Sequence, residues 1–498
     1  WVLRLIGERT MKVETLLEKK AMRQLLTVQQ TILAGGTCSV SDLTAFLAVT
    51  KASFEKDLED LHYFLKPFGQ DCQLTYDGQQ LSITLSDFFS LNHLIEAFVK
   101  ESLKFQLLDY LYRNKEFSIV QLTTKFMISE SSLFRKIKEL NQLLAVFDLQ
   151  IKNGQLQGEE LQIRYFYFQL YWYITPYEIH QKKTMSPLNK RIIEGIETGL
   201  GFTFNEHNAL KVSLWLSITK KRLAVTSKKY QQLRKKMIDF KEDPLFKQVR
   251  QLFFRFSSRY SLELDEGESM IHFVFLITMS VLPESAFDEY SLIRGRRSAV
   301  SLADTFILEN VVLYYRPHKF EPTLEKTMAY YFSQIHGKLY FFKGELEVFD
   351  RAHIWEKEQQ LSSRELASFS TTLLEKALAC FDETYQPGDS LHELSLVKYL
   401  SVLALIEFKM IGEIKIGIHL AMDALYQAAL TQVLMLSLKN MNGTLVERYQ
   451  PEQTYDLIVT NYQQTSYQGT PEVYVLSELS STYDVQQLKK KIRTLREK

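Results

Sequence analysis

The sequence predicts a multidomain, mainly helical protein that ends in a small α/β domain. Its 498 residues are too many for one hydrophobic core, so we expect several domains. Leu, Lys, Glu and Gln are abundant, which favours helices, and the scarcity of Gly and Pro disfavours long disordered linkers. After position 411 the pattern changes to alternating strands and helices, which is typical of a small α/β domain.

An internal repeat occupies the first third of the chain. Residues 39–50 recur as residues 118–129, and the apolar spacing of the segment that follows recurs with them. The apolar positions are Phe54, Leu58, Leu61 and Leu65 in the first copy and Leu133, Ile137, Leu140 and Leu144 in the second. Both sets have the spacing of one helix face, so each copy is expected to hold a helix, a turn and a second helix.

Each copy ends in a hairpin signal, at 77–78 (Asp-Gly) in the first and at 153–154 (Asn-Gly) in the second. Helix, turn, helix and hairpin in tandem predict two winged helix-turn-helix units. We place them at residues 1–95 and 96–161. This arrangement indicates double-stranded DNA as the partner.

The first unit begins with an apolar helix that runs to about Ala34 and ends at Gly35-Gly36. Ser39 is a suitable N-cap for the first helix of the motif, and Thr50 for the second. The outer face of the second helix and its cap supply the DNA-binding candidates Thr50, Lys51, Ser53 and Lys56. The same helix carries acidic residues that repel phosphate: Glu55, Asp57, Glu59 and Asp60.

The second unit begins with a helix expected from about Lys100 to Arg113, and Ser129 is the expected N-cap of its recognition helix. The DNA-binding candidates on or near the outer face of that helix are Ser131, Ser132, Arg135, Lys136 and Lys138. Arg135 is suited to a guanine edge, and the two lysines are suited to phosphates. A wing over residues 147–158 places Asn153 beside the DNA backbone. The more basic helix makes this the principal DNA-binding unit.

Two helical-bundle domains are expected next, over residues 162–286 and 287–410, because long amphipathic helices alternate with short breaks there. A basic run between Lys220 and Arg250 has two open interpretations. It is a solvated helix face, or it is an auxiliary surface for DNA or a phosphoprotein.

The last domain, residues 411–498, is expected to hold four strands and two helices. The strands are predicted at 414–418, 444–448, 456–460 and 472–476, and the helices at 424–438 and 485–496. Their alternation indicates a mainly parallel sheet.

The totals narrow the possible classes of protein. The net charge of +1 does not exclude DNA binding, because a neutral sum can hide a basic face. Cys38, Cys72 and Cys380 are far apart, without a disulfide framework or zinc spacing, which fits a reducing cytoplasm. No signal peptide and no long uncharged apolar run is found. We therefore expect a cytoplasmic protein without a membrane partner, metal or cofactor.

The order of these parts resembles the Mga/AtxA-type regulators of Gram-positive bacteria. The resemblance depends most on the paired helix-turn-helix units at 39–65 and 118–144 and on the strand and helix pattern from Ile414. It implies a stand-alone transcriptional regulator, usually an activator, often of virulence or surface-protein genes. It also implies that the middle domains are similar to phosphotransferase-system regulatory domains (PRD) and that the last domain is similar to an EIIB component. Such a terminal domain commonly supports self-association, so a homodimer or higher oligomer is expected.

The resemblance implies phosphorylation of histidines in the middle domains by phosphotransferase-system phosphocarrier proteins. The candidates here are His207, His272 and His336, of which His336 fits the pattern best. The helices at 214–222 and 399–405 lack the histidines of the full set, so the chain departs from the family there.

An active EIIB component carries phosphate on a cysteine after its first strand, whereas the loop 417–423 has none and offers only His419. No Walker loop, GxGxxG, HExxH or GxSxG segment is present, so no catalytic residue is expected. Two alternatives to a DNA-binding regulator stay open. One is a phosphotransferase-system phosphocarrier component, and the other is a protein-interaction scaffold that does not bind DNA.

Overall fold

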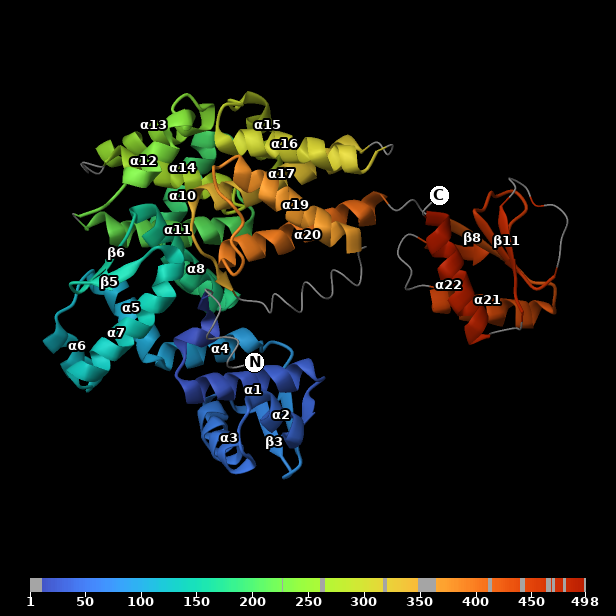
Figure 1. The fold of residues 1–498 in the computed structure, drawn as a ribbon, viewed down its shortest axis with the longest axis horizontal. Helices are drawn as coiled ribbons and strands as arrows, with labels where there is room; N and C mark the ends of the chain where they lie inside the picture. The colour runs from blue at the N-terminus through green and yellow to red at the C-terminus, as the bar shows by residue number, and fades with distance from the viewer. Residues whose placement is uncertain are drawn as a thin grey trace. The chain divides into compact units, whose positions relative to one another are not determined.

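The computed structural model describes residues 11–225, 227–259, 265–316, 320–347, 364–410, 414–438, 444–462, 467, 471–477 and 481–496. Within these ranges the chain is mainly helical with a few short sheets, as the sequence predicts (Figure 1). Two compact units are present, residues 1–318 with 326–400 and residues 319–325 with 401–498, and each is described by itself. The five narrower domains expected from the sequence stay a prediction.

The first helix-turn-helix segment follows a short N-terminal strand. Gly35 and Gly36 have φ values of 88° and 95°, and this backbone ends the first helix and turns the chain into a three-stranded antiparallel sheet of order β2-β4-β3. The elements are β1 (Met11–Lys12), α1 (Lys19–Leu33), β2 (Thr37–Ser39), α2 (Val40–Leu47), α3 (Lys51–Leu65), β3 (Cys72–Tyr76) and β4 (Gln80–Leu85).

The second segment repeats this order with a shorter hairpin. Its strands pair antiparallel, and an isolated bridge between Glu116 and Gln155 takes the place of the third strand. The elements are α4 (Leu91–Glu101), α5 (Leu103–Asn114), α6 (Ile119–Phe126), α7 (Glu130–Leu144), β5 (Gln150–Lys152) and β6 (Gln155–Gln157). The apolar repeat forms the core of both copies, since Phe54 and Leu61 are 1% exposed and Leu133 and Leu140 are fully buried.

The helix expected from about Lys100 begins later, at Leu103. Ser102 separates α4 from α5 and is the N-cap of α5, because its hydroxyl accepts a hydrogen bond from the Phe105 amide at 3.5 Å. The same hydroxyl donates to the Leu16 carbonyl. A local cap and a contact distant in sequence together fix this break, and the apolar periodicity does not reveal it.

The helix α8 (Glu160–Ile174) is buried along most of its length. Arg164 at its centre has no exposure and pairs with Glu160 at 2.9 Å and with Glu268 at 2.7 Å. Arg222 pairs with Glu160 as well, at 2.7 Å, so this buried ion cluster joins α8 to two other helices. No helix of the described residues is long and apolar enough to cross a membrane.

Further helices follow α8, and two of them, Pro322–Phe341 and Ser390–Met410, have residues in both compact units. A parallel pairing of Met11 with Leu346 joins two distant parts of the chain, β1 and β7. The elements are α9 (Tyr177–Thr184), α10 (Pro187–Leu200), α11 (Glu206–Leu223), α12 (Gln231–Lys236), α13 (Pro244–Arg259), α14 (Glu266–Thr278), α15 (Glu284–Ile293), α16 (Ala299–Tyr314), α17 (Pro322–Phe341), β7 (Leu346–Glu347), α19 (Arg364–Ala379) and α20 (Ser390–Met410).

The second compact unit, which contains residues 401–498, holds a four-stranded parallel sheet of order β11-β10-β8-β9. Its elements agree with the predicted strands and helices within a few residues. They are β8 (Ile414–His419), α21 (Ala424–Leu438), β9 (Thr444–Arg448), β10 (Leu457–Thr460), β11 (Glu472–Val475) and α22 (Thr482–Arg496). Ile416, Leu457 and Leu488 are among the fully buried residues of its core.

Candidate nucleic-acid interface

The two helix-turn-helix turns have the same backbone geometry. Ala48 and Met127 both lie in the left-handed region, with φ of 53° and 50°, and each ends the first helix of its motif. Thr50 and Ser129 then cap the second helices, since their hydroxyls accept from the Ser53 and Ser132 amides, each at 3.3 Å. The sequence repeat therefore corresponds to a repeat of local structure, and the predicted caps are present.

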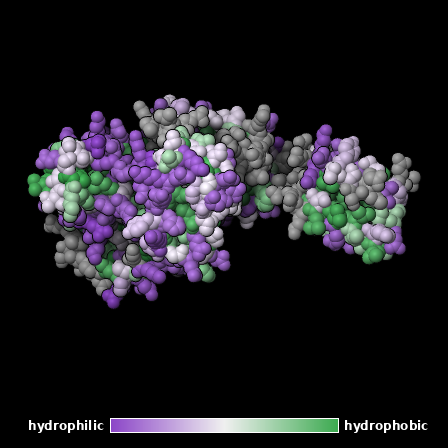
Figure 2. Space-filling model, turned by 90° about the horizontal axis from the view of Figure 1, so that it is seen from below, coloured by the Kyte–Doolittle hydropathy of each residue, from purple (hydrophilic) through white to green (hydrophobic). Residues whose placement is uncertain are grey.

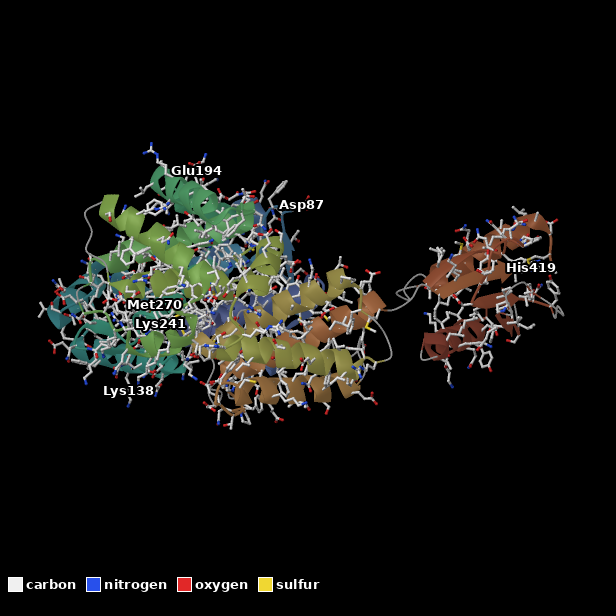
Figure 3. All side chains as sticks on the ribbon, turned by 90° about the horizontal axis from the view of Figure 1, so that it is seen from above. Asp87, Lys138, Glu194, Lys241, Met270 and His419 are labelled. Atoms are coloured by element: carbon white, nitrogen blue, oxygen red, sulfur yellow. The ribbon has the colours of Figure 1, made fainter. Side chains whose placement is uncertain are left out.

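The outer face of α7 carries a continuous polar and apolar stripe. Ser131, Phe134, Arg135 and Lys138 are exposed and spaced at i, i+3, i+4 and i+7, so they lie on one side of the helix. Neither Arg135 nor Lys138 has an ion pair or hydrogen-bonded side-chain partner among the described residues. Lys138 extends outward from the second segment in Figure 3. This face is free to meet a polyanion.

Phe134 is a site residue that the sequence reasoning missed. Its ring is 54% exposed on the stripe, between Ser131 and Lys138. An exposed phenylalanine on a recognition helix is suited to apolar contact with a thymine methyl group in the major groove. The signal was present in the sequence, because Phe134 follows the buried Leu133 and therefore cannot share its inner face.

Lys136 departs from its expected role. Its side chain is only 12% exposed and pairs with Glu18 at 2.7 Å and with Glu139 at 3.0 Å. The helix turns this position toward the N-terminal segment and away from the outer face. Two carboxylates already pair with the ammonium group, so Lys136 takes part in ion pairs in this conformation, and its contact with phosphate stays a prediction.

The wing of the second segment is fixed at its tip. Asn153 and Gly154 have φ of 53° and 73°, as a tight hairpin turn requires, and the Gly154 carbonyl accepts from the Phe117 amide at 2.9 Å. Asn153 and the neighbouring Lys152 are exposed. Lys152 was also missed, although a lysine directly before a wing turn is well placed for a phosphate.

The first segment uses its candidate residues mostly within itself. Lys51 donates to the Gly78 carbonyl at the hairpin turn, at 3.0 Å, and therefore ties the helix to its own wing. Thr50 and Ser53 are joined by the cap. Lys56 is exposed and lacks an ion pair among the described residues, so it is the candidate of this helix that is free for phosphate.

Three of the four acidic residues in α3 have partners. Asp57 pairs with Arg23 at 2.6 Å, Asp60 pairs with Lys20, and Glu55 accepts from the Tyr76 hydroxyl at 2.7 Å. Glu59 is exposed and has no such contact within the described part of the chain. The acidic residues of α3 thus mainly attach it to α1 and to the hairpin, which the sequence alone did not distinguish from a repulsive surface.

Five of the eleven cations in the basic run form ion pairs with described residues. Its partnered cations are Arg222 with Glu160, Lys228 with Glu268, Arg234 with Asp265, Lys247 with Glu242 and Arg250 with Glu266. Four of these five cations are compensated by carboxylates distant in sequence, whereas Glu242 is close to Lys247 in the chain. This pairing gives part of the run a structural role, and for the other cations both interpretations stay open.

The three candidate phosphorylation sites differ in accessibility. His336 is completely buried, and both of its ring nitrogens are engaged, Nδ1 with Asp304 at 2.5 Å and Nε2 with the Tyr399 hydroxyl at 2.5 Å. A phosphoryl donor cannot reach either nitrogen without opening the helix packing. The pattern match at His336 therefore coincides with a core network in this conformation.

His272 and His207 have different surroundings. His272 is half-buried, and its Nδ1 accepts from the Trp215 indole at 3.3 Å. Burial lowers the pKa of His272 to about 4. His207 is exposed and lies against the rings of Trp172 and Tyr177. Burial lowers the pKa of His207 below its ordinary value, so its ring is neutral at neutral pH, as an attacking imidazole must be.

The terminal unit places His419 at the carboxyl end of β8 (Figure 3). The ring is surrounded by Tyr449, Tyr462 and Tyr467, with the Tyr462 hydroxyl 3.2 Å from Nδ1. The described loop after β8 contains no cysteine, as the sequence already shows. Among the described residues, no group of His, Cys, Asp and Glu is arranged to hold a metal ion.

Comparison with known proteins identifies the second segment. Residues 87–171 match the family model of the Mga helix-turn-helix domain, a range that contains α5 to α7 and the wing. Over 207 residues the chain is 25% identical to a protein of Streptococcus pneumoniae serotype 4 described as a "Putative trans-acting regulator". That alignment covers 40% of this chain and 41% of the relative, so the chain matches about two fifths of the relative's length. The resemblance to the Mga-type regulators is confirmed.

Proposed function

We propose that this chain, which carries a helix-turn-helix domain of the Mga type, is a DNA-binding transcriptional regulator. The observation that carries the proposal is the unpaired outer face of α7, with Arg135, Lys138 and Phe134 on one side. In a helix-turn-helix protein this helix enters the major groove, and its early residues meet base edges. Lys152 and Asn153 of the wing then lie near the adjacent phosphates.

The residues of this interface are expected to contact different parts of the DNA because their side chains differ in chemistry. Arg135 is the candidate for a guanine edge, because a guanidinium donates two parallel hydrogen bonds to its acceptors. Lys138 and Lys152 act on phosphate and contribute affinity without sequence information. Ser131 and Ser132 are placed by the cap at the start of α7, where hydroxyls can meet either a base or the backbone.

The test is a salt titration of DNA binding by the full-length chain, with a labelled mixed-sequence duplex. We expect Lys138→Ala to lower the slope of log K against log salt by about one unit, because one phosphate contact is lost. Lys490→Ala is the matched control, since Lys490 is an exposed lysine of the terminal unit. Equal low-salt affinity of the wild type and an Arg135→Ala, Lys138→Ala double variant would favour the protein-interaction scaffold instead.

A genome-wide map of bound DNA would identify the target promoters. The family resemblance supports an activator of virulence, surface-protein or carbohydrate-linked genes, and transcript levels with and without the protein give the sign of regulation. Loss of mapped sites in the Arg135→Ala variant is the expected result.

Self-association through the terminal unit is the second part of the proposal. The helix α21 exposes Leu425, Tyr426 and Leu436 by 75%, 67% and 66%, and hydrophobic residues gather on the surface of this unit in Figure 2. Such a patch is typical of an interface. We expect Leu436→Glu to lower the molar mass measured by light scattering, with Lys490→Glu as the control for added negative charge.

Control by phosphotransferase-system phosphocarrier proteins is the third part. Of the three candidate histidines, His207 is exposed, whereas His336 is enclosed by Asp304 and Tyr399. Incubation with phosphoenolpyruvate and the phosphocarrier proteins should label the wild type and the His336→Ala variant but not His207→Ala. Onward transfer of the phosphoryl group to a sugar would instead favour a phosphocarrier component.

A further inference from the structure

The helical part of the first unit contains a cavity of about 430 Å³ among α10, α11, α13 and α14. Its volume lies within the range of small-molecule sites. Most of its lining is aliphatic or aromatic, with Ile192 from α10, Trp215 from α11 and Phe256 from α13. An apolar cavity of this size without an occupant forgoes favourable contacts, so a ligand that fills it is stabilised by burial.

Two glycines set the approach of α10 to α13 beside this cavity. A Cβ atom at Gly195 would lie 2.9 Å from the Phe256 ring, and one at Gly199 would lie 2.3 Å from the Leu252 side chain. The two helices are therefore already in close contact at these positions. Closing the cavity by a further approach of α10 to α13 is blocked there by backbone against side chain.

The polar groups of the lining are few, and two of them are already satisfied. The Asn189 amide donates to the Ser213 carbonyl at 3.0 Å, and the Thr219 hydroxyl accepts from Arg164 at 3.3 Å. Sugars and nucleotides need many hydrogen-bonding partners, which these walls do not offer. The ligand must be largely apolar.

His272 supplies one directed donor. Its Nδ1 accepts from Trp215, so the ring proton lies on Nε2, and Nε2 has no hydrogen-bond partner among the described residues. The lowered pKa of His272 agrees with a neutral ring that donates through Nε2 only. A ligand acceptor would complete the hydrogen bonds of this side chain.

Lys220 supplies a positive charge. It is an exposed residue of α11 that also belongs to the lining, and it has no ion pair among the described residues. Its neighbour Lys221 is exposed too but does not line the cavity. An apolar cavity with one N–H donor and one ammonium group is complementary to a chain that ends in a carboxylate.

We propose that this cavity binds a fatty acid, with its hydrocarbon chain between α10 and α13 and its carboxylate at His272 and Lys220. The site is separate from the recognition helix α7, and it contains His272, one of the three candidate phosphorylation sites, but not His207 or His336. It makes the helical part of the first unit a sensor of an amphipathic carboxylate and does not depend on the proposed DNA binding.

The test is a calorimetric titration of the full-length chain with sodium dodecanoate below its micelle concentration. The wild type should bind dodecanoate, and binding should change the fluorescence of Trp215, which lies in the wall of the cavity. We expect Lys220→Glu to weaken binding about tenfold and His272→Phe to weaken it to a similar extent, with Lys221→Glu unchanged as the matched control. Ile192→Trp should prevent binding by filling the cavity, and circular dichroism checks that this variant is folded.

Dodecyltrimethylammonium has the same hydrocarbon chain with a positive head group and should bind at least tenfold more weakly. Equal binding of the two amphiphiles, or equal weakening by Lys220→Glu and Lys221→Glu, would overturn the proposal. So would the absence of dodecanoate binding. A further result would also contradict the proposal: the wild type binds no dodecanoate, and Ile192→Trp dissociates an oligomer. The cavity would then be part of an interface between copies of the chain.

Discussion

The two helix-turn-helix segments have the same internal plan and opposite external chemistry. In the repeat, Asp57 corresponds to Lys136, and both side chains turn inward to form ion pairs, with Arg23 and with Glu18. On the outer face, Glu55 corresponds to Phe134 and Glu59 corresponds to Lys138. The fold therefore depends on positions that the copies share, and the capacity to bind DNA depends on positions at which they differ.

The wings extend this contrast. In the first segment Lys51 and Tyr76 tie the recognition helix to its own hairpin. In the second the hairpin tip is held from the other side by Phe117, and the face of α7 stays open. In the first segment, polar side chains join the recognition helix to its own hairpin, whereas in the second segment the outer face of the recognition helix is exposed. Four comparisons of matched variants test this difference.

The largest effect is expected in the shared cores. Leu61→Ala and Leu140→Ala each remove a side chain that is at most 1% exposed, so each should lower stability by about 2–5 kcal/mol. Hydrogen-exchange protection of α3 and of α7 measures the two losses separately. Similar losses are expected, and a clearly smaller loss at either position would show that the two cores are not equivalent.

The second largest effect on stability is expected at the two hairpin glycines, and it should differ between the segments. A Cβ at Gly154 would lie 2.2 Å from the Phe117 carbonyl oxygen, whereas nothing lies within 4 Å of one at Gly78. Both glycines have positive φ, so Gly78→Ala should cost about 1–2 kcal/mol and Gly154→Ala about 2–4 kcal/mol. Thermal unfolding of both variants and the wild type measures which substitution lowers the stability more. Equal costs would mean that the contact of the second wing with Phe117 is dispensable.

Charge changes on the outer faces of α7 and α3 are expected to have the third largest effect, and the property that they change is DNA affinity. Lys138→Glu is expected to weaken DNA binding by about tenfold or more at low salt, because it removes one phosphate contact and adds repulsion. Glu59→Lys should leave affinity unchanged or raise it slightly. Anisotropy titrations at two salt concentrations give both values. A larger effect of Glu59→Lys would make α3 the principal recognition helix.

The smallest effect is expected at the caps. Thr50→Ala and Ser129→Ala each remove a hydroxyl that accepts from the third residue of the following helix, which costs about 1 kcal/mol. Replacement by Asp should restore most of the stability, because Asp also caps. If Ser129→Asp restores stability but weakens DNA binding, the start of α7 lies close to phosphates.

Three roles could not be settled from the sequence, and the reason is the same for each. Lys136, the basic run and His336 stand in local patterns, and the structure pairs Lys136, His336 and some cations of the run with side chains distant in sequence. Glu18 lies far from Lys136 in the chain, as Glu160 does from Arg222, and Asp304 and Tyr399 enclose His336. Local spacing shows where a side chain sits on its own helix but not which element packs against that face.

The sequence alone determined the repeat, the caps, the turns and the positions of the strands along the terminal domain, because short-range spacing and backbone preference set them. Only the tertiary structure decided which cations are free. A charged side chain that meets a carboxylate from another element becomes part of the scaffold, and one that meets none stays available for a ligand. Arg135, Lys138 and Lys220 belong to the second kind, and Lys136 and Arg222 belong to the first.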